Sequence, residues 1–227
     1  MKLAAVFSGG KDSTFSVYKS MKEGHEIKYL ITISPKRADS YMFHVPDIGW
    51  THLQAEAMGI EQIFKEVSGE KEIEVEELKD VFSSIKSEVN GIVSGAIASS
   101  YQKSRIDRIC AELGLKSVAP IWGVDQEKYI RELLENGLKS IFTGVAAEGL
   151  DKEWLGRELD NDAIGKLVEL HEKYGINVAG EGGEYESFVL DSPIFKKRVV
   201  INDAERVWDD KGKNGYLLIK DAALKNK

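Results

Sequence analysis

The segment Leu3-Ala4-Ala5-Val6-Phe7-Ser8-Gly9-Gly10-Lys11-Asp12-Ser13 decides the fold. Residues 3–7 are an apolar run of strand length, and residues 14–20 continue with helical spacing. Two consecutive glycines at the junction let the backbone fold closely around an anion. The N–H groups at the start of the helix point into the same space, with the positive end of the helix dipole behind them. The sequence therefore predicts a phosphate-binding loop between the first strand and the first helix.

The side chains of this loop suit a nucleotide phosphate. Ser8 and Ser13 offer hydroxyl donors, Lys11 offers a mobile positive charge, and Asp12 offers a carboxylate for a Mg²⁺ ion that bridges phosphate oxygens. The P-loop of kinases requires Ser or Thr after Gly-Lys, and Asp12 stands there instead. The Rossmann fingerprint requires a third glycine, which is missing. The remaining alternative is an ordinary strand-to-helix turn with a polar cap.

Strand-length apolar runs alternate with helical segments through the first two thirds of the chain, which predicts βαβ crossovers and a parallel sheet. The predicted strands are residues 3–7, 27–33, 62–67, 91–94, 116–119 and 140–144. The predicted helices are residues 13–23, 50–58, 75–88, 99–113 and 126–136. The fold class is therefore α/β, with a parallel Rossmann-like sheet covered by helices on both faces.

The last third of the chain has a different pattern. A helix is predicted at 160–174, and two β-rich runs, 198–208 and 216–219, flank a turn typical of an antiparallel hairpin. We therefore expect an ATP-binding domain at residues 1–143 and a smaller α+β domain for substrate recognition at residues 144–227.

Composition narrows the class of protein. The chain has 227 residues, of which 42% are hydrophobic and 30% are charged, so it can bury a core. Its 38 acidic and 31 basic residues give a net charge of -7, which argues against nucleic acid as a partner. Cys110 is the single cysteine, so no intramolecular disulfide can form. The sequence also contains no apolar run long enough for a membrane span. We expect a cytoplasmic protein without a membrane partner.

A second cluster of chemistry-bearing residues is Gly180-Glu181-Gly182-Gly183-Glu184-Tyr185-Glu186. Three glycines and three carboxylates in seven residues disfavour a helix or a packed strand, so a loop is predicted. Such a loop suits recognition of a cationic or amine-bearing group, or help from a second metal ion. A solvated acidic turn is the alternative.

These motifs together resemble a known family. The loop from Ser8 to Ser13 resembles the PP-loop of the N-type ATP pyrophosphatases, whose sheet is of the adenine nucleotide alpha hydrolase type. The acidic cluster, followed by Leu190-Asp191-Ser192-Pro193, resembles the signature of the diphthine-ammonia ligase family. Residues 39–44, 94–105 and 120–123 also match that family's pattern, so the resemblance spans nearly the whole chain.

The resemblance implies a reaction. ATP with Mg²⁺ would activate the carboxylate of diphthine on elongation factor 2 as an acyl-adenylate, and ammonium would then displace AMP, with pyrophosphate as the other product. The resemblance also implies roles for individual residues. Catalysis would fall to Lys11, Asp12, Glu184 and Glu186, with Asp12 on the metal. ATP would be held by Ser8, Gly9, Gly10, Lys11, Asp12, Ser13, Ile33, Gly95 and Ala96. Substrate would be held by Ser40, Tyr41, His44, Gln102, Arg105, Trp122, Gly182, Gly183, Glu184, Tyr185 and Glu186.

Several alternatives stay open at this point. The compact chain resembles archaeal members of the family. A tRNA-modifying PP-loop enzyme is a second hypothesis, although such an enzyme would be expected to have paired cysteines and a basic surface. A non-catalytic ATP-binding module is a third. Gln102 and Arg105 could be a surface pair on a helix, His44 could be structural, and the oligomeric state, a homo-oligomer included, is undetermined.

Overall fold

The computed structural model describes residues 1–35, 47–68 and 73–227. Its first sheet has five parallel strands in the order β3-β2-β1-β4-β5. These strands are β1 (Lys2–Val6), β2 (Glu26–Pro35), β3 (Glu61–Val67), β4 (Gly91–Val93) and β5 (Lys116–Val118). The strand order reverses between β1 and β4, and a crevice for ligands is expected at such a point, beyond the carboxyl ends of the strands. The predicted α/β class with a parallel sheet is confirmed.

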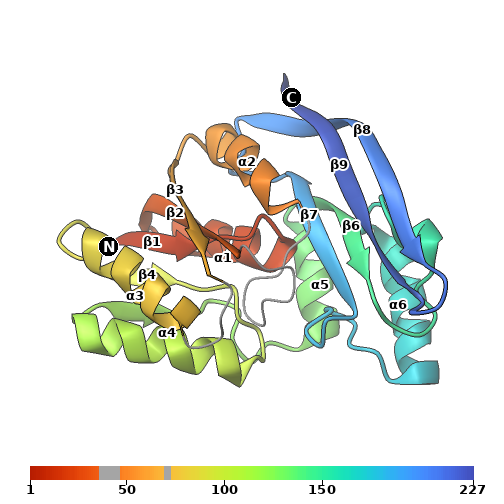
Figure 1. Ribbon diagram of the computed structural model, residues 1–227, viewed down its shortest axis with the longest axis horizontal. Coiled ribbons are helices and arrows are strands. Elements are labelled where there is room, and N and C mark those ends of the chain that lie inside the picture. Colours follow the sequence, from red (N-terminus) through yellow and green to blue (C-terminus); the bar gives the residue numbers. More distant parts are fainter. Residues whose placement is uncertain (36–46, 69–72) are drawn as a thin grey trace.

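Helices cover both faces of this sheet (Figure 1). They are α1 (Lys11–Lys22), α2 (Thr51–Met58), α3 (Ile73–Ile85), α4 (Ser100–Leu113) and α5 (Gln126–Glu135). Alternate residues of β1 enter different apolar clusters: Leu3 and Ala5 pack with the cluster that contains α1 and α5 residues, and Ala4 packs with α3 and α4 residues. Successive side chains of β1 point to opposite faces of the sheet and therefore pack against two different layers of helices. Cys110 of α4 is buried in the second cluster, as expected for a core residue.

The second sheet has four antiparallel strands in the order β7-β6-β9-β8. They are β6 (Lys139–Val145), β7 (Tyr185–Asp191), β8 (Lys197–Asp209) and β9 (Asn214–Asn226). Strands β8 and β9 form the predicted hairpin, which is longer than expected. Helix α6 (Asn161–Tyr174) and the short helices η1 (Ile48–Trp50) and η2 (Lys152–Trp154) complete the set of described helices.

Two sequence-based assignments are corrected here. Residues 140–144 were predicted as a sixth strand of the parallel sheet, but β6 pairs antiparallel with β7 and β9. A short apolar strand fits either kind of sheet, and its membership depends on partners far along the chain. The acidic cluster was predicted to be loop throughout, but Tyr185 and Glu186 begin β7, because Tyr185, Phe188 and Val189 bury their side chains in the core.

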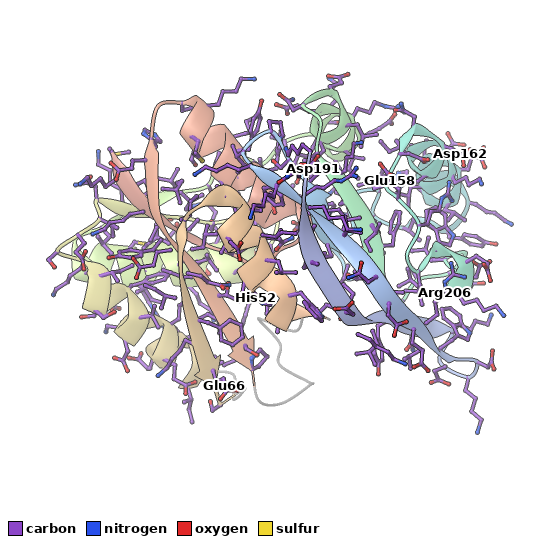
Figure 2. All side chains as sticks on the ribbon, turned by 90° about the horizontal axis from the view of Figure 1, so that it is seen from above. His52, Glu66, Glu158, Asp162, Asp191 and Arg206 are labelled. Atoms are coloured by element: carbon purple, nitrogen blue, oxygen red, sulfur yellow. The ribbon has the colours of Figure 1, made fainter. Side chains whose placement is uncertain are left out.

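The two sheets share one apolar core, since residues of β1, α1, α5, β6, β7 and α6 belong to a single buried cluster. In Figure 2, Glu66 at the end of β3 lies on the side of the first sheet, while Arg206 of β8 and Asp162 of α6 lie on the side of the second. The division into units at residues 143 and 144 stays a prediction. Among the described residues, no helix is both long enough and apolar enough to cross a membrane.

Candidate functional site

The predicted phosphate loop connects β1 to α1 at the carboxyl edge of the parallel sheet. Its hydroxyls bond to one another: Ser13 Oγ donates to Gly10 O (3.1 Å), accepts from Ser8 N (3.3 Å) and lies 3.2 Å from Ser8 Oγ. Gly9 has a φ of 78°, in the left-handed region that glycine adopts without strain. The loop is thus pre-shaped, and α1 presents its N-terminal end to the space beside it.

Lys11 and Asp12 form an ion pair at the start of α1. Lys11 Nζ donates to Asp12 Oδ2 (2.9 Å) and lies 5.0 Å from the centre of the Tyr185 ring. Burial lowers the pKa of Lys11, but the charge and hydrogen bond of Asp12, together with Tyr185 and the charge of Glu186, outweigh burial and leave the pKa above its ordinary value. The lysine is therefore a buried permanent cation, only 3% exposed, beside the loop.

The other oxygen of Asp12 is held by a residue that was not predicted. Tyr129 of α5 donates its hydroxyl to Asp12 Oδ1 (2.6 Å). Burial and the charge of Asp12 raise the pKa of Tyr129 well above its ordinary value, so the phenol remains a donor. Asp12 thus has a fixed orientation, set by Lys11 on one oxygen and by Tyr129 on the other.

Strand β7 of the second sheet packs directly against the phosphate loop. Val189 N donates to Gly9 O (3.0 Å), and Lys11 N donates to Ser187 Oγ (3.1 Å). A Cβ atom at Gly10 would lie 3.2 Å from Ser187 O, so glycine favours this close approach. The shape of the loop therefore depends on both sheets, although all of its residues belong to the segment that leads from β1 into α1.

The acidic cluster forms a tight turn before β7. Glu184 accepts hydrogen bonds from the backbone amides of Asn177 (2.9 Å) and Gly182 (2.8 Å), so its carboxylate holds the turn itself. Glu181 reaches across to the segment after β4 and accepts from Ile97 N and Ala98 N, both at 3.3 Å. Glu184 was predicted to face a substrate cation, and that role stays a prediction.

Two carboxyl groups of this cluster have raised pKa values. Burial raises the pKa of Glu186 to about 7, against the opposing charge of Lys11. Burial, together with the negative charge of Asp12, also raises the pKa of Glu181. Three carboxylates and one ammonium thus share a partly desolvated space, and Glu186 changes its protonation state near neutral pH.

A cavity of ≈ 760 Å³ joins the loop and the turn. It is bordered by residues from both sheets: Val6, Phe7, Ser8, Lys11, Asp12, Ser13, Ile33, Ile48, Ser94, Gly95, Ala96, Ser99, Tyr101, Gln102, Ile106, Gly144, Val145, Ala146, Gly180, Glu181, Gly182, Gly183, Tyr185, Glu186, Asn214, Gly215 and Tyr216. The hydroxyl of Ser94, which borders the cavity, is buried without a hydrogen-bond partner within the described structure. This volume lies within the range of small-molecule and cofactor sites.

Most of the predicted residues meet at this cavity. The cavity is bordered by Ile33, Gly95, Ala96 and Gln102 together with Ser8, Lys11, Asp12 and Ser13 of the phosphate loop. Three other predicted residues, Gly9, Gly10 and Glu184, are not among its lining residues. A Cβ atom at Gly95 would lie 2.9 Å from Ser13 N, so this glycine allows the segment after β4 to touch the start of α1. Arg105 and Trp122 are not among the lining residues: the Arg105 guanidinium lies 3.3 Å from the centre of the Tyr101 ring, and Trp122 is 39% exposed.

Ser40, Tyr41 and His44 lie outside the described residues, and their predicted roles stay predictions. The sequence analysis in turn missed Tyr129, Ser187 and Glu181 as contributors, and also Gln54, whose Nε2 donates to Gly9 O (2.9 Å). Glu181 stood inside the acidic cluster and could have been found there. Tyr129 occupied an apolar helical position, and nothing local distinguished it from a core residue.

A Mg²⁺ ion was predicted at Asp12. Among the described residues there is no group of three or more His, Cys, Asp or Glu side chains that could hold a metal by themselves. Mg²⁺ typically binds to one or two carboxylates together with substrate phosphates, and keeps several waters. Asp12 beside the phosphate loop fits an ion of that kind, which is completed by the nucleotide.

This geometry defines a class: an α/β protein whose first strand leads into a phosphate loop, with a carboxylate-rich turn from a second sheet across the same cavity. Two family models then match almost the whole chain, the diphthamide synthase N-terminal domain at residues 1–117 and the diphthamide synthase C-terminal domain at residues 125–224. The chain belongs to the diphthamide synthase family.

Curated relatives agree with this assignment. The chain is similar to the diphthine-ammonia ligase of Mus musculus, with 36% identity over 91% of this chain and 85% of the relative. It is also similar to that of Danio rerio, with 38% identity over 91% of this chain and 89% of the relative. The enzyme of Schizosaccharomyces pombe is 35% identical over 100% of this chain and 40% of the relative. The resemblance to the diphthine-ammonia ligase family is therefore confirmed. The archaeal origin of the chain stays a prediction.

Proposed function

We propose that this chain is an ATP-dependent ligase that amidates the carboxylate of diphthine with ammonium and releases AMP and pyrophosphate. Curated relatives at this level of identity carry the name diphthine-ammonia ligase. One structural observation carries the proposal: the phosphate loop and the carboxylates of Glu181 and Glu186 border the same cavity. A nucleotide bound at the phosphate loop and an amine bound near the two glutamates can thus both reach a substrate carboxylate in the cavity.

The loop supplies electrostatic stabilisation. A carboxylate does not react with ammonia at a useful rate, so attack on the α-phosphorus of ATP would first give an acyl-adenylate. The leaving pyrophosphate gains negative charge during this step. Lys11 is a buried, permanently charged donor beside the loop, and the N-terminus of α1 adds backbone donors. These groups lie in place before the reaction begins.

Glu186 suits the second half of the reaction. Ammonium must lose a proton before its nitrogen can attack the acyl carbon. With a pKa of about 7, Glu186 can accept that proton and release it again at neutral pH. We assign the base to Glu186 and, because the carboxylate of Glu184 is bonded to backbone amides, a supporting position to Glu184.

Mg²⁺ would reach Asp12 with the nucleotide and neutralise charge on the phosphates. Tyr129 and Lys11 hold the Asp12 carboxylate in one orientation, which keeps an oxygen donor next to the loop. Ile33, Gly95 and Ala96 would hold the adenosine end, where backbone and small side chains border the cavity. The substrate protein would be elongation factor 2 in the cytoplasm, and the part of the chain from residue 144 would recognise it.

A reconstitution experiment tests this function. Purified protein is incubated with Mg-ATP, ammonium and elongation factor 2 that carries diphthine, and AMP, pyrophosphate and the mass of the modified histidine are measured. A ligase forms AMP, pyrophosphate and the amidated histidine only when every component is present. Formation of ADP, or AMP formation that requires tRNA instead of elongation factor 2, would contradict the proposal. Nucleotide binding without turnover would indicate the non-catalytic module.

A further inference from the structure

Gln54 of α2 is a fully buried amide that contacts both the phosphate loop and β7. Its exposed fraction is 0%. Gln54 Nε2 donates to Gly9 O (2.9 Å) and to Val189 O (2.8 Å). Both partners are carbonyl oxygens, so the NH₂ group must face them, and this fixes the orientation of the amide. One side chain thus joins the loop of the first sheet to β7 of the second.

The carbonyl of Gly9 is the common point of these contacts. It accepts from Gln54 Nε2 and also from Val189 N (3.0 Å). A peptide unit whose oxygen is held by two donors cannot rotate, so the amide groups on either side of it also keep their direction. Since Gly9 precedes the N-terminus of α1 by two residues, the direction of its peptide units shapes the space offered to phosphate.

The space around Gly9 shows that the fit is close. A Cβ atom at Gly9 would lie 2.4 Å from Gln54 Oε1 and 2.8 Å from Thr51 Cγ2. The φ of 78° independently requires glycine at this position. The same residue is therefore limited by its backbone angle and by the side chain that packs on it.

We propose that Gln54 is a positioning residue of the phosphate loop: its amide fixes the Gly9 carbonyl against β7 and so holds the loop in the shape that binds the phosphates of the nucleotide. Ser187 acts in the same way at the next position, because its Oγ accepts from Lys11 N (3.1 Å). The inference rests on the proposed function only in requiring that the loop binds nucleotide phosphates.

The test replaces Gln54 with leucine, which has similar volume and no donor. Binding of α,β-methylene ATP with Mg²⁺ is measured by calorimetry, together with the melting temperature. Loss of the buried hydrogen bonds to Gly9 O of the loop and to Val189 O of β7 should raise the Kd roughly 10-fold. In the full reaction, the KM for ATP should rise by a similar factor while the KM for ammonium stays unchanged. A purely structural role would instead affect all substrates together with stability.

Gln62→Leu is the matched control. Gln62 Nε2 donates to Thr32 Oγ1 and Thr51 Oγ1, both at 2.8 Å, so its removal also loses two bonds beside α2, and neither of them is made to an atom of the loop or of β7. Its Kd should remain within about 2-fold of the wild type. Equal losses of affinity in the two variants would overturn the proposal, as would an unchanged Kd in folded Gln54→Leu.

Ser187→Ala keeps the proposal testable if Gln54→Leu does not fold, because it removes only one hydroxyl. It should raise the Kd about 3- to 10-fold, since Lys11 N loses its acceptor. An unchanged Kd for this variant would likewise contradict the inference. The nucleotide assay is independent of diphthine: a chain that binds the analogue but makes no diphthamide disproves the proposed function, and leaves this inference to be decided by the Kd values.

Discussion

The phosphate loop at residues 8–13 and the acidic turn at residues 180–184 are both short and glycine-rich, yet they are held in different ways. The loop depends on partners far along the chain: Ser187 is 176 residues from Lys11, and Tyr129 is 117 residues from Asp12. The turn is bonded mainly by its neighbours, through Asn177 and Glu184. A ready-made phosphate motif therefore requires the second sheet, whereas the turn can shape itself locally.

The largest effect is expected for Lys11→Met, which removes the buried cation of the loop. The charges of Asp12 and Glu186 would lose their counterion, and the leaving phosphates would lose a donor. We expect kcat to fall roughly 1,000-fold. Lys19→Met is the control, because Lys19 pairs with Glu132 at the surface of the molecule, and kcat should change by less than about 2-fold. Retention of a tenth of the wild-type kcat by Lys11→Met would show that the loop works without this charge.

Glu186→Gln is expected to have the next largest effect. Wild-type activity should rise with pH through about 7, as the carboxyl loses its proton and becomes a base. The glutamine variant should lose roughly 100-fold in kcat at pH 8 and no longer show this rise. A pH–rate profile of both proteins measures the difference. An unchanged profile in the variant would assign the base to another group.

The same carboxyl has an effect on stability with a defined sign. Its folded-state pKa lies above the ordinary value of 4.5, so the folded protein keeps a proton that the unfolded chain has lost between pH 4.5 and about 7. Its contribution to stability is complete below pH 4.5 and is lost as pH rises through 7. Glu186→Gln should therefore melt higher than the wild type at pH 8, and this advantage should shrink toward pH 4.5.

Gly95→Ala tests how closely the segment after β4 touches the loop. The added methyl group would lie 2.9 Å from Ser13 N and 3.0 Å from Ser13 Cα, and both of these are backbone atoms. We expect nucleotide affinity to fall roughly 10-fold as the start of α1 shifts. Gly165→Ala is the control: Gly165 lies in α6 with nothing within 4 Å of an added Cβ, so this variant should keep full affinity and gain slightly in stability. Equal affinities of the two variants would refute the close contact.

The smallest effect is expected for Glu184→Gln, which tests the local character of the turn. One amide oxygen can still accept a backbone hydrogen bond, so kcat should fall less than about 5-fold. Measurement of kcat for Glu184→Gln and Glu186→Gln side by side decides whether Glu184 has a supporting or a catalytic role. A decrease in kcat as large as that of Glu186→Gln would assign a catalytic role to Glu184.

Much of the fold was predictable because its signals are local. All five strands of the parallel sheet and the helices between them were predicted within a few residues, from apolar periodicity and from glycine at helix ends. The phosphate loop was identified from its place between strand and helix. The β8–β9 hairpin followed from its turn. The sheet that β6 joins was not predictable, because the same apolar strand fits either sheet.

The sequence by itself determined the class of chemistry, because glycines, a lysine and carboxylates at fixed local spacing define a phosphate loop and an acidic turn. Only the tertiary structure decided how the site is completed. Gln54 and Ser187 carry ordinary polar side chains, and Tyr129 lies on an apolar helical face. Their importance comes from hydrogen bonds to the loop across 45, 176 and 117 residues of chain. Such contacts depend on how whole elements pack, which no local pattern records.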